Sequence, residues 1–195
     1  MTVTNKEILL VDTVPDLLTS KLTAAGFTCT DAFDITLEEL ILRSKDNVAG
    51  IVIRSRFRLM ADEILQLGDL DFIARVGSGM ENIDTEAAEA RGIRCLNAPE
   101  GNSNAVAEHS MGLLLGLMRN IPRSYNQVLN GKWIREGNRG DELEGRTVGI
   151  IGFGNTGSKF ASKLKSFDCK VIAYDPYVEI NKLKFPHVIQ SDLSE

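Results

Sequence analysis

The stretch Thr147-Val-Gly-Ile-Ile-Gly-Phe-Gly-Asn-Thr-Gly157 decides how this chain is expected to fold. Its first half is a short apolar run, which is typical of a buried strand. Its second half has the glycine spacing G-x-G-x-x-G, at Gly152, Gly154 and Gly157. In a dinucleotide-binding turn these glycines allow, in order, a tight turn, close approach of a pyrophosphate, and close packing of the next helix. The stretch therefore predicts a phosphate-binding turn.

The segments that follow this turn support the same interpretation. A helical pattern over Ser158 to Phe167 would point free N–H groups at the phosphates. An apolar run, Lys170 to Tyr174, predicts a second buried strand that ends at Asp175. A carboxylate there can bind an adenosine ribose and repel a 2′-phosphate, which favours NAD over NADP. Two alternatives remain, since such glycines also occur in ordinary turns and Asp175-Pro176 favours a turn for local reasons.

Composition indicates a globular protein that acts on small molecules. The chain has 195 residues, 43% of them hydrophobic and 25% charged, and a net charge of −5 without a basic cluster. We therefore expect no nucleic-acid partner. No apolar stretch reaches the length of a membrane span, and the N-terminus lacks a signal-peptide layout. Three widely spaced cysteines favour neither a disulfide framework nor a zinc site, so we expect a cytoplasmic protein without a metal.

Upstream of the glycine turn, short apolar strands alternate with helical patterns, which predicts a parallel, flavodoxin-like α/β unit. The expected strands are 8–11, 27–29, 50–53, 72–76 and 93–96, and the expected helices are 15–25, 37–45, 62–67 and 85–91. Asp84 is expected to cap the last of these helices, and Gly26 and Gly92 to end two of them in a left-handed conformation. We place a domain boundary near Pro99 to Asn102, between a substrate domain (1–100) and an NAD-binding domain (101–195).

A longer apolar helix is expected from Ser103 to Asn120, ended by Pro122 and followed by a polar connection, Asn130 to Gly145. A helix that is apolar over most of its length is usually buried between domains or subunits.

With these segments in place, the chain resembles the NAD-dependent D-isomer-specific 2-hydroxyacid dehydrogenases, in particular their D-3-phosphoglycerate dehydrogenase branch. Four blocks carry the resemblance: Ile53-Arg-Ser-Arg56, Arg75-Val-Gly-Ser-Gly-Met-Glu-Asn-Ile-Asp84, Asn97-Ala-Pro-Glu-Gly-Asn-Ser-Asn-Ala-Val-Ala-Glu-His109 and Gly145-Arg-Thr-Val-Gly-Ile-Ile-Gly-Phe-Gly-Asn-Thr-Gly157. The resemblance implies a flavodoxin-like substrate domain followed by the first half of a Rossmann domain. It also implies a homodimer formed through the Ser103–Asn120 region.

The resemblance assigns a substrate site to the first domain. It implies that the loop of Gly77, Ser78 and Gly79 offers backbone N–H groups to the substrate carboxylate, and a glycine-flanked turn after a strand is a natural anion nest. Further substrate-binding positions are implied at Arg54, Ser55, Arg56 and Asn102. Guanidinium groups suit a phosphate, although arginines at strand ends are often solvated. One of the two arginines could bind the anion while the other faces water.

The resemblance assigns NAD to the second domain. The implied cofactor-binding residues are Ser78, Gly152, Phe153, Gly154, Asn155, Thr156, Gly157, Asp175 and Pro176.

The family's catalytic histidine, glutamate and arginine lie beyond the last matched block, so we expect no catalytic residue in this chain. His109 is interpreted as a structural or interface histidine, and His187 as a loop residue near the start of a strand. We expect the sequence to be a truncated portion that is inactive alone, with a second sheet that ends after two strands and keeps an open edge and face.

The expected activity is hydride transfer between nicotinamide and C2 of a 2-hydroxy or 2-oxo acid of the 3-phosphoglycerate, hydroxypyruvate or glyoxylate type. The alternative is a non-catalytic NAD(H)-binding interaction protein of the same fold. A related NAD enzyme such as a formate dehydrogenase is a third possibility.

Overall fold

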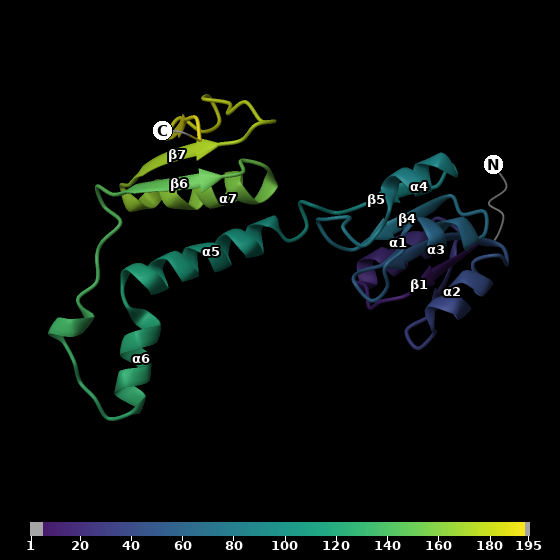
Figure 1. Cartoon of the computed structure of the whole chain (residues 1–195), viewed down its shortest axis with the longest axis horizontal. Helices are drawn as coiled ribbons and strands as arrows, with labels where there is room; N and C mark the ends of the chain where they lie inside the picture. Colours follow the sequence, from purple (N-terminus) through teal and green to yellow (C-terminus); the bar gives the residue numbers. More distant parts are fainter. Residues whose placement is uncertain (1–5, 194–195) are drawn as a thin grey trace. The chain divides into compact units, whose positions relative to one another are not determined.

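A computed structural model describes residues 6–193 and divides the chain into two compact units, Met1–Gly101 and Asn102–Glu195 (Figure 1). Each unit contains one parallel sheet and has its own apolar core. The functions of the two units as substrate and cofactor domains stay predictions at this point.

The first unit is a five-stranded parallel sheet in the order β2-β1-β3-β4-β5. Its strands are β1 (Glu7–Leu10), β2 (Thr28–Asp31), β3 (Val48–Ile53), β4 (Phe72–Arg75) and β5 (Arg94–Leu96), and its helices are α1 (Asp16–Ala24), α2 (Leu37–Arg43), α3 (Ala61–Gln66) and α4 (Thr85–Ala90). This strand order confirms the flavodoxin-like prediction. The order changes direction between β1 and β3, and open α/β sheets bind ligands beside such a switch point, at the carboxyl ends of the strands.

The central strand β3 explains how this unit holds together. All six of its residues are buried, as expected for a parallel strand covered on both faces. Ile51 and Ile53 belong to the core cluster that also contains Leu40 of α2, Ile64 of α3 and Ala88 of α4. Val52 belongs to a separate cluster with Ile8 and Leu10 of β1, against which Leu18 and Leu22 of α1 pack.

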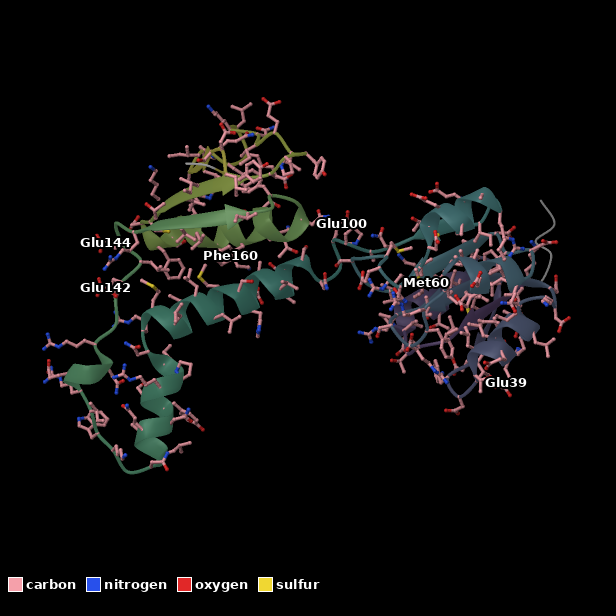
Figure 2. All side chains as sticks on the ribbon, in the orientation of Figure 1. Glu39, Met60, Glu100, Glu142, Glu144 and Phe160 are labelled. Carbon is pink, nitrogen blue, oxygen red and sulfur yellow. The ribbon has the colours of Figure 1, made fainter. Side chains whose placement is uncertain are left out.

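Local signals fix the ends of these helices. The Asp84 carboxylate accepts a hydrogen bond from the Ala87 N–H at 3.0 Å, which confirms the predicted cap of α4. Gly26 and Gly92 have positive φ values of 91° and 76°, as predicted. A capping box that we did not predict starts α2, where Thr36 and Glu39 exchange side-chain and backbone hydrogen bonds. Figure 2 labels Glu39 on this helix.

The second unit contains a three-stranded parallel sheet in the order β6-β7-β8. Its elements are α5 (Ser103–Met118), α6 (Ile121–Leu129), η1 (Glu136–Asn138), β6 (Thr147–Ile151), α7 (Asn155–Leu164), η2 (Lys165–Phe167), β7 (Lys170–Tyr174) and β8 (Val188–Gln190). Three parallel strands in consecutive order are one half of a Rossmann sheet, as predicted. The expectation of only two strands was wrong, because Val188–Gln190 pairs with β7.

Helices α5 and α7 lie along each other beside this sheet (Figure 1). Met111 of α5, together with Ala161 and Leu164 of α7, joins Val171 and Ala173 of β7 in one core. Phe160, also on α7, packs against the same core (Figure 2). Within this unit α5 is buried on one side only, because Leu113 and Leu117 are 62% and 76% exposed. Its burial between domains or subunits stays a prediction.

The end of α5 differs from the prediction. The helix ends at Met118, and Asn120 adopts a left-handed conformation with φ of 55°. Pro122 therefore does not stop α5. It lies in the first turn of α6, a helix we did not predict, where a proline is tolerated because that N–H has no partner within the helix.

One face of the second sheet is open in the described part of the unit. Ile151 and Ile189 are 80% and 51% exposed, and a shallow apolar hollow of about 150 Å³ lies beside Ile151 and Ile172. This confirms the predicted uncovered face. Within residues 6–193, no helix combines the length and the apolar character needed to cross a membrane.

Burial along α2 gives a direct test of the first unit's core. Leu40 is fully buried, whereas Leu42 on the same helix is 66% exposed. We expect Leu40→Ala to lower the free energy of unfolding by about 2–5 kcal/mol, because it removes core contacts and leaves a cavity. Leu42→Ala is the matched control and should change it by less than about 0.5 kcal/mol. Urea unfolding followed by far-UV circular dichroism measures both, and equal losses would contradict this core.

Candidate functional site

The three glycines of the turn after β6 each meet a different physical requirement. Gly152 has φ of 92°, a backbone conformation that residues other than glycine rarely adopt. A Cβ on Gly157 would lie 2.0 Å from the carbonyl oxygen of Gly152, so only glycine lets α7 start this close to the turn. A Cβ on Gly154 would meet nothing within 4 Å. The backbone at Gly154 thus has open space beside it, as the approach of a pyrophosphate requires.

Helix α7 points its amino-terminal end at this open space. It begins at Asn155, three residues before the predicted start at Ser158, so Asn155 and Thr156 form its first turn. The earliest helical hydrogen bond runs from the Ser158 N–H to the Gly154 carbonyl at 3.0 Å. N–H groups in a first helical turn have no acceptor within the helix, and together with the helix dipole they favour a bound anion.

Asp175 links the end of β7 to the glycine turn. Its Oδ2 accepts a hydrogen bond from the Phe153 N–H at 2.7 Å, and its Oδ1 accepts from the N–H groups of Tyr177 and Val178 at 2.8 and 3.1 Å. The local turn that we considered as an alternative is therefore present. An ionised carboxylate can accept about four hydrogen bonds, so three backbone donors leave room for one ribose hydroxyl.

Phe153 and Pro176 are two further residues that we predicted to bind the cofactor. The Phe153 ring is buried and packs edge-on against Phe185, with ring centroids 5.1 Å apart. Its N–H donates to Asp175, so Phe153 anchors the turn in the core, and its cofactor contact stays a prediction. Pro176 is exposed in the turn after Asp175, and its cofactor contact stays a prediction.

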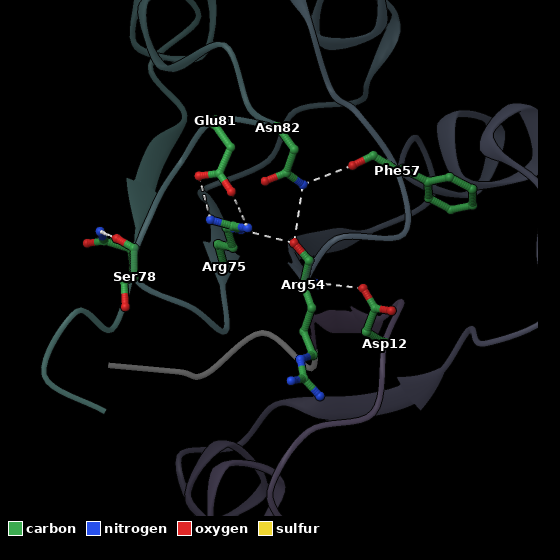
Figure 3. Close-up of polar contacts among 8 residues, drawn as sticks. Asp12, Arg54, Phe57, Arg75, Ser78, Glu81 and Asn82 are labelled. Atoms are coloured by element: carbon green, nitrogen blue, oxygen red, sulfur yellow. Dashed lines mark hydrogen bonds and ion pairs between the residues drawn. The ribbon is translucent and has the colours of Figure 1, made fainter. Parts of the chain in front are cut away.

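In the first unit, polar groups converge on the peptide of Arg54, just after β3 (Figure 3). The Arg54 N–H donates to Asp12 Oδ2 at 2.6 Å. The Arg54 carbonyl accepts from Arg75 Nε at 3.0 Å and from Asn82 Nδ2 at 3.2 Å. Arg54 is exposed and lies at the β1/β3 switch point, so its guanidinium is open to a ligand there.

Arg56 makes several contacts within its own unit. Its guanidinium donates to the carbonyls of Val11, Ala32 and Ile35 at 3.4, 3.3 and 2.6 Å, and it lies 4.9 Å from the centre of the Phe57 ring. These contacts tie together the loops that follow β1 and β2. Arg56 is also exposed, and its substrate role stays a prediction. Ser55 is exposed beside it, and its substrate role stays a prediction.

The loop after β4 is held by the start of the Asn97 block. The Gly77 carbonyl accepts from the Ala98 N–H at 2.9 Å, and the Ser78 carbonyl accepts from Asn97 Nδ2 at 2.6 Å. The Gly77 N–H donates to the Arg75 carbonyl at 2.9 Å, so in this conformation it is not an anion donor. A Cβ at Gly79 would lie 2.1 Å from Glu81 Oε2, so a larger residue there would require the exposed Glu81 side chain to move. The carboxylate-binding role of the loop stays a prediction.

Asn102 and the two histidines belong to the second unit. Asn102 precedes α5 without capping it through its side chain, and its substrate role stays a prediction. His187 Nε2 lies 2.9 Å from the Ala161 carbonyl, so the ring is held against α7, away from the glycine turn. His109 is exposed on α5. His187 lies in the turn directly before β8, which confirms the expectation of a loop residue near the start of a strand.

Several residues of these sites were not predicted. Asp12, Arg75 and Asn82 contact the main chain of Arg54, and Glu81 pairs with Arg75. A signal existed for three of them, since Arg75, Glu81 and Asn82 lie in the block that carried the resemblance.

Asp175 also gives a test that depends on pH. Hydrogen bonds from the Tyr177 and Phe153 N–H groups stabilise its charged form and lower its pKa. A lowered folded pKa stabilises the fold above the unfolded value, near 3.9, and this contribution is lost as the pH falls through the folded pKa. We expect carboxyl NMR to place the midpoint of Asp175 below that value. Asp175→Asn should destabilise the chain at pH 7, and the difference from the unmodified chain should shrink below about pH 4. A difference that is independent of pH would contradict these contacts.

Known proteins match both the sequence and this fold. Residues 111–195 match the family described as D-isomer specific 2-hydroxyacid dehydrogenase, NAD binding domain. The D-3-phosphoglycerate dehydrogenase of Homo sapiens is 35% identical over 173 residues, which cover 89% of this chain and 32% of that protein. A hydroxypyruvate reductase of Thermotoga maritima is 39% identical over 150 residues, which cover 75% of this chain and 49% of that protein.

Among solved structures, an NAD-dependent formate dehydrogenase from Staphylococcus aureus in complex with NAD aligns with a TM-score of 0.76 at 24% identity. The alignment covers 96% of this chain and 60% of that one, and at this identity it shows the shared fold alone. This chain thus spans about a third to a half of the length of the two relatives that match in sequence. Together these matches show that the second unit falls within the NAD-binding domain family of the D-isomer-specific 2-hydroxyacid dehydrogenases, and that the chain is similar in sequence to the two relatives over 75–89% of its length.

Proposed function

We propose that this chain supplies the NAD-binding turn and part of the substrate site of an NAD-dependent dehydrogenase. The enzyme would transfer hydride between the nicotinamide and C2 of a D-2-hydroxy or 2-oxo acid of the 3-phosphoglycerate, hydroxypyruvate or glyoxylate type. The observation that carries the proposal is the glycine turn: Gly154 leaves space beside the backbone, and the first turn of α7 points N–H groups into it.

The residues of the second unit fit the adenosine half of NAD. Asn155, Thr156 and Gly157 would donate backbone hydrogen bonds to the pyrophosphate. Asp175 would accept a hydrogen bond from the ribose with its remaining capacity and would disfavour a 2′-phosphate by charge repulsion, so we propose NAD rather than NADP. Bound NAD supplies the hydride chemistry, and these residues hold and orient it.

The residues of the first unit fit an anionic substrate. In the proposal, the Arg54 guanidinium binds the phosphate or carboxylate at the switch point, where a charge-assisted hydrogen bond is shorter and stronger than a neutral one. Ser55 and the amide of Gly79 are further candidate donors, and Ser78 completes the set proposed for this unit. We assign the acid–base step to none of these residues.

Two finer proposals concern the protein's environment. We propose a cytoplasmic location, which is supported by the free thiols of Cys29, Cys95 and Cys169. We also propose a homodimer formed through the α5 region, supported by the exposed leucines of that helix.

The glycine turn is tested by Gly154→Val. A side chain has room at this position in the free protein but would occupy the space assigned to the pyrophosphate. We expect a folded chain that binds NADH at least about tenfold more weakly, measured by titration calorimetry. Gly112→Val is the matched control, because a Cβ on that α5 glycine also meets nothing within 4 Å. Equal affinities of the two variants for NADH would contradict the site.

An activity assay tests whether the chain alone oxidises NADH when hydroxypyruvate or glyoxylate is added. Since His187 is held against α7 and no other acid–base residue is assigned, we expect no measurable NADH oxidation by these 195 residues. Turnover would show that a residue of this chain performs the acid–base step.

The homodimer is tested at the exposed side of α5. Leu113 and Leu117 lie one turn apart and are 62% and 76% exposed. We expect the double change Leu113→Glu and Leu117→Glu to convert a dimer into a monomer, because it places charges in an apolar interface. Light scattering after size-exclusion chromatography measures this. Leu42→Glu, at a 66% exposed leucine of α2, is the control and should leave the mass unchanged.

A further inference from the structure

The peptide of Arg54 is held from three sides by side chains of other elements (Figure 3). Asp12, after β1, accepts from its N–H at 2.6 Å. Arg75, at the end of β4, donates from Nε to its carbonyl at 3.0 Å. Asn82 donates to the same carbonyl at 3.2 Å and to the Phe57 carbonyl at 2.9 Å. The turn Arg54–Phe57 is therefore fixed at both of its ends, while the Arg54 side chain extends away from these contacts.

Arg75 is oriented by a second contact. Its Nη1 and Nη2 donate to the two carboxylate oxygens of Glu81 at 2.8 and 2.7 Å. The guanidinium is planar, so this bidentate pair fixes the direction of the Nε–H that reaches Arg54. The Arg75 side chain is 13% exposed, whereas that of Glu81 is 71% exposed. Arg75 is thus held between Glu81 and the peptide of Arg54.

This arrangement gives the two arginines different electrostatic roles. Glu81 compensates the charge of Arg75. The pKa of Glu81 is lowered first by a hydrogen bond from its own backbone and second by its hydrogen bond with Arg75. The Arg54 guanidinium has no described contact with a carboxylate in residues 6–193, so its charge is free to attract an anion.

We infer that Arg75, oriented by Glu81, is a positioning residue that fixes the Arg54 turn so that the Arg54 guanidinium meets an anionic substrate at the β1/β3 switch point. This inference rests on the proposed function for the identity of the substrate. Arg75 acts through the Arg54 peptide and does not touch the substrate itself. Lysine cannot replace it, because an ammonium group lacks the planar fork that reaches both partners.

The first measurement needs no ligand. Hydrogen exchange of the Arg54 amide, followed by NMR in the full 195-residue chain, reports how firmly the turn is held. We expect Arg75→Lys to accelerate this exchange about tenfold. We expect Glu81→Gln to accelerate it less; the Glu81 side chain is exposed and tolerates this change. Arg43→Lys is the matched control, since Arg43 pairs with Glu7 at 2.8 Å near the opposite end of the strands. Unchanged exchange in both Arg75→Lys and Glu81→Gln would overturn the inference.

The second measurement is a double-mutant cycle with 3-phosphoglycerate as the probe, using calorimetry. We expect Arg54→Ala and Arg75→Lys each to weaken binding about tenfold, and the double variant to bind no more weakly than Arg54→Ala. If the loss of affinity in the double variant equalled the product of the losses in the two single variants, the inference would be overturned, because Arg75 would then act independently of Arg54. A binding constant of Arg75→Lys equal to that of Arg43→Lys would overturn it as well.

The two measurements separate this inference from the proposed function. If the unmodified chain does not bind 3-phosphoglycerate, or if Arg54→Ala binds it equally well, the proposed substrate role of Arg54 fails. The exchange of the Arg54 amide then still decides whether Arg75 and Glu81 hold the turn.

Discussion

Parallel strand pairing is the constraint on which both candidate sites depend. In each unit every strand pair is parallel, so the carboxyl ends of all strands lie at one edge of the sheet. Within each unit, this edge brings together segments that are far apart in sequence. In the first unit they follow β1, β3 and β4, and in the second unit they follow β6 and β7. Arg54, Gly154 and Asp175 all lie in such segments.

Carboxylates at these strand ends serve as internal acceptors for backbone N–H groups. Asp12, after β1, accepts a hydrogen bond from the N–H of Arg54, after β3. Asp175, after β7, accepts one from the N–H of Phe153, after β6. Glu81 extends the same principle to a side chain by fixing the fork of Arg75. A hydrogen bond to a charged group is stronger than a neutral one, so these contacts hold otherwise irregular segments in one conformation. The ligand groups that remain free are then presented by a fixed backbone.

The sequence allowed much of this architecture to be predicted, and particular residues show where prediction ended. The apolar runs located seven of the strands, and the G-x-G-x-x-G spacing located the turn whose Gly152, Gly154 and Gly157 have separate physical requirements. Strand β8 was missed because three residues in a polar stretch carry almost no periodic signal. Helix α6 was missed because Pro122 was taken as a stop signal, although a proline in a first turn starts a helix equally well. Nothing in Ile53-Arg-Ser-Arg56 shows that the second guanidinium donates hydrogen bonds to three carbonyl groups, because those carbonyls lie in segments far away in the sequence.

The central claim is that the turn from Gly152 to Gly157 and the start of α7 hold the pyrophosphate of NAD. The most direct measurement is an NMR titration of the chain with NADH that follows every backbone amide. Our account predicts that the largest, saturable shifts fall on Gly154, Asn155, Thr156 and Gly157, with smaller shifts around Asp175. Saturable binding whose shifts lie elsewhere, or the absence of binding, would contradict it.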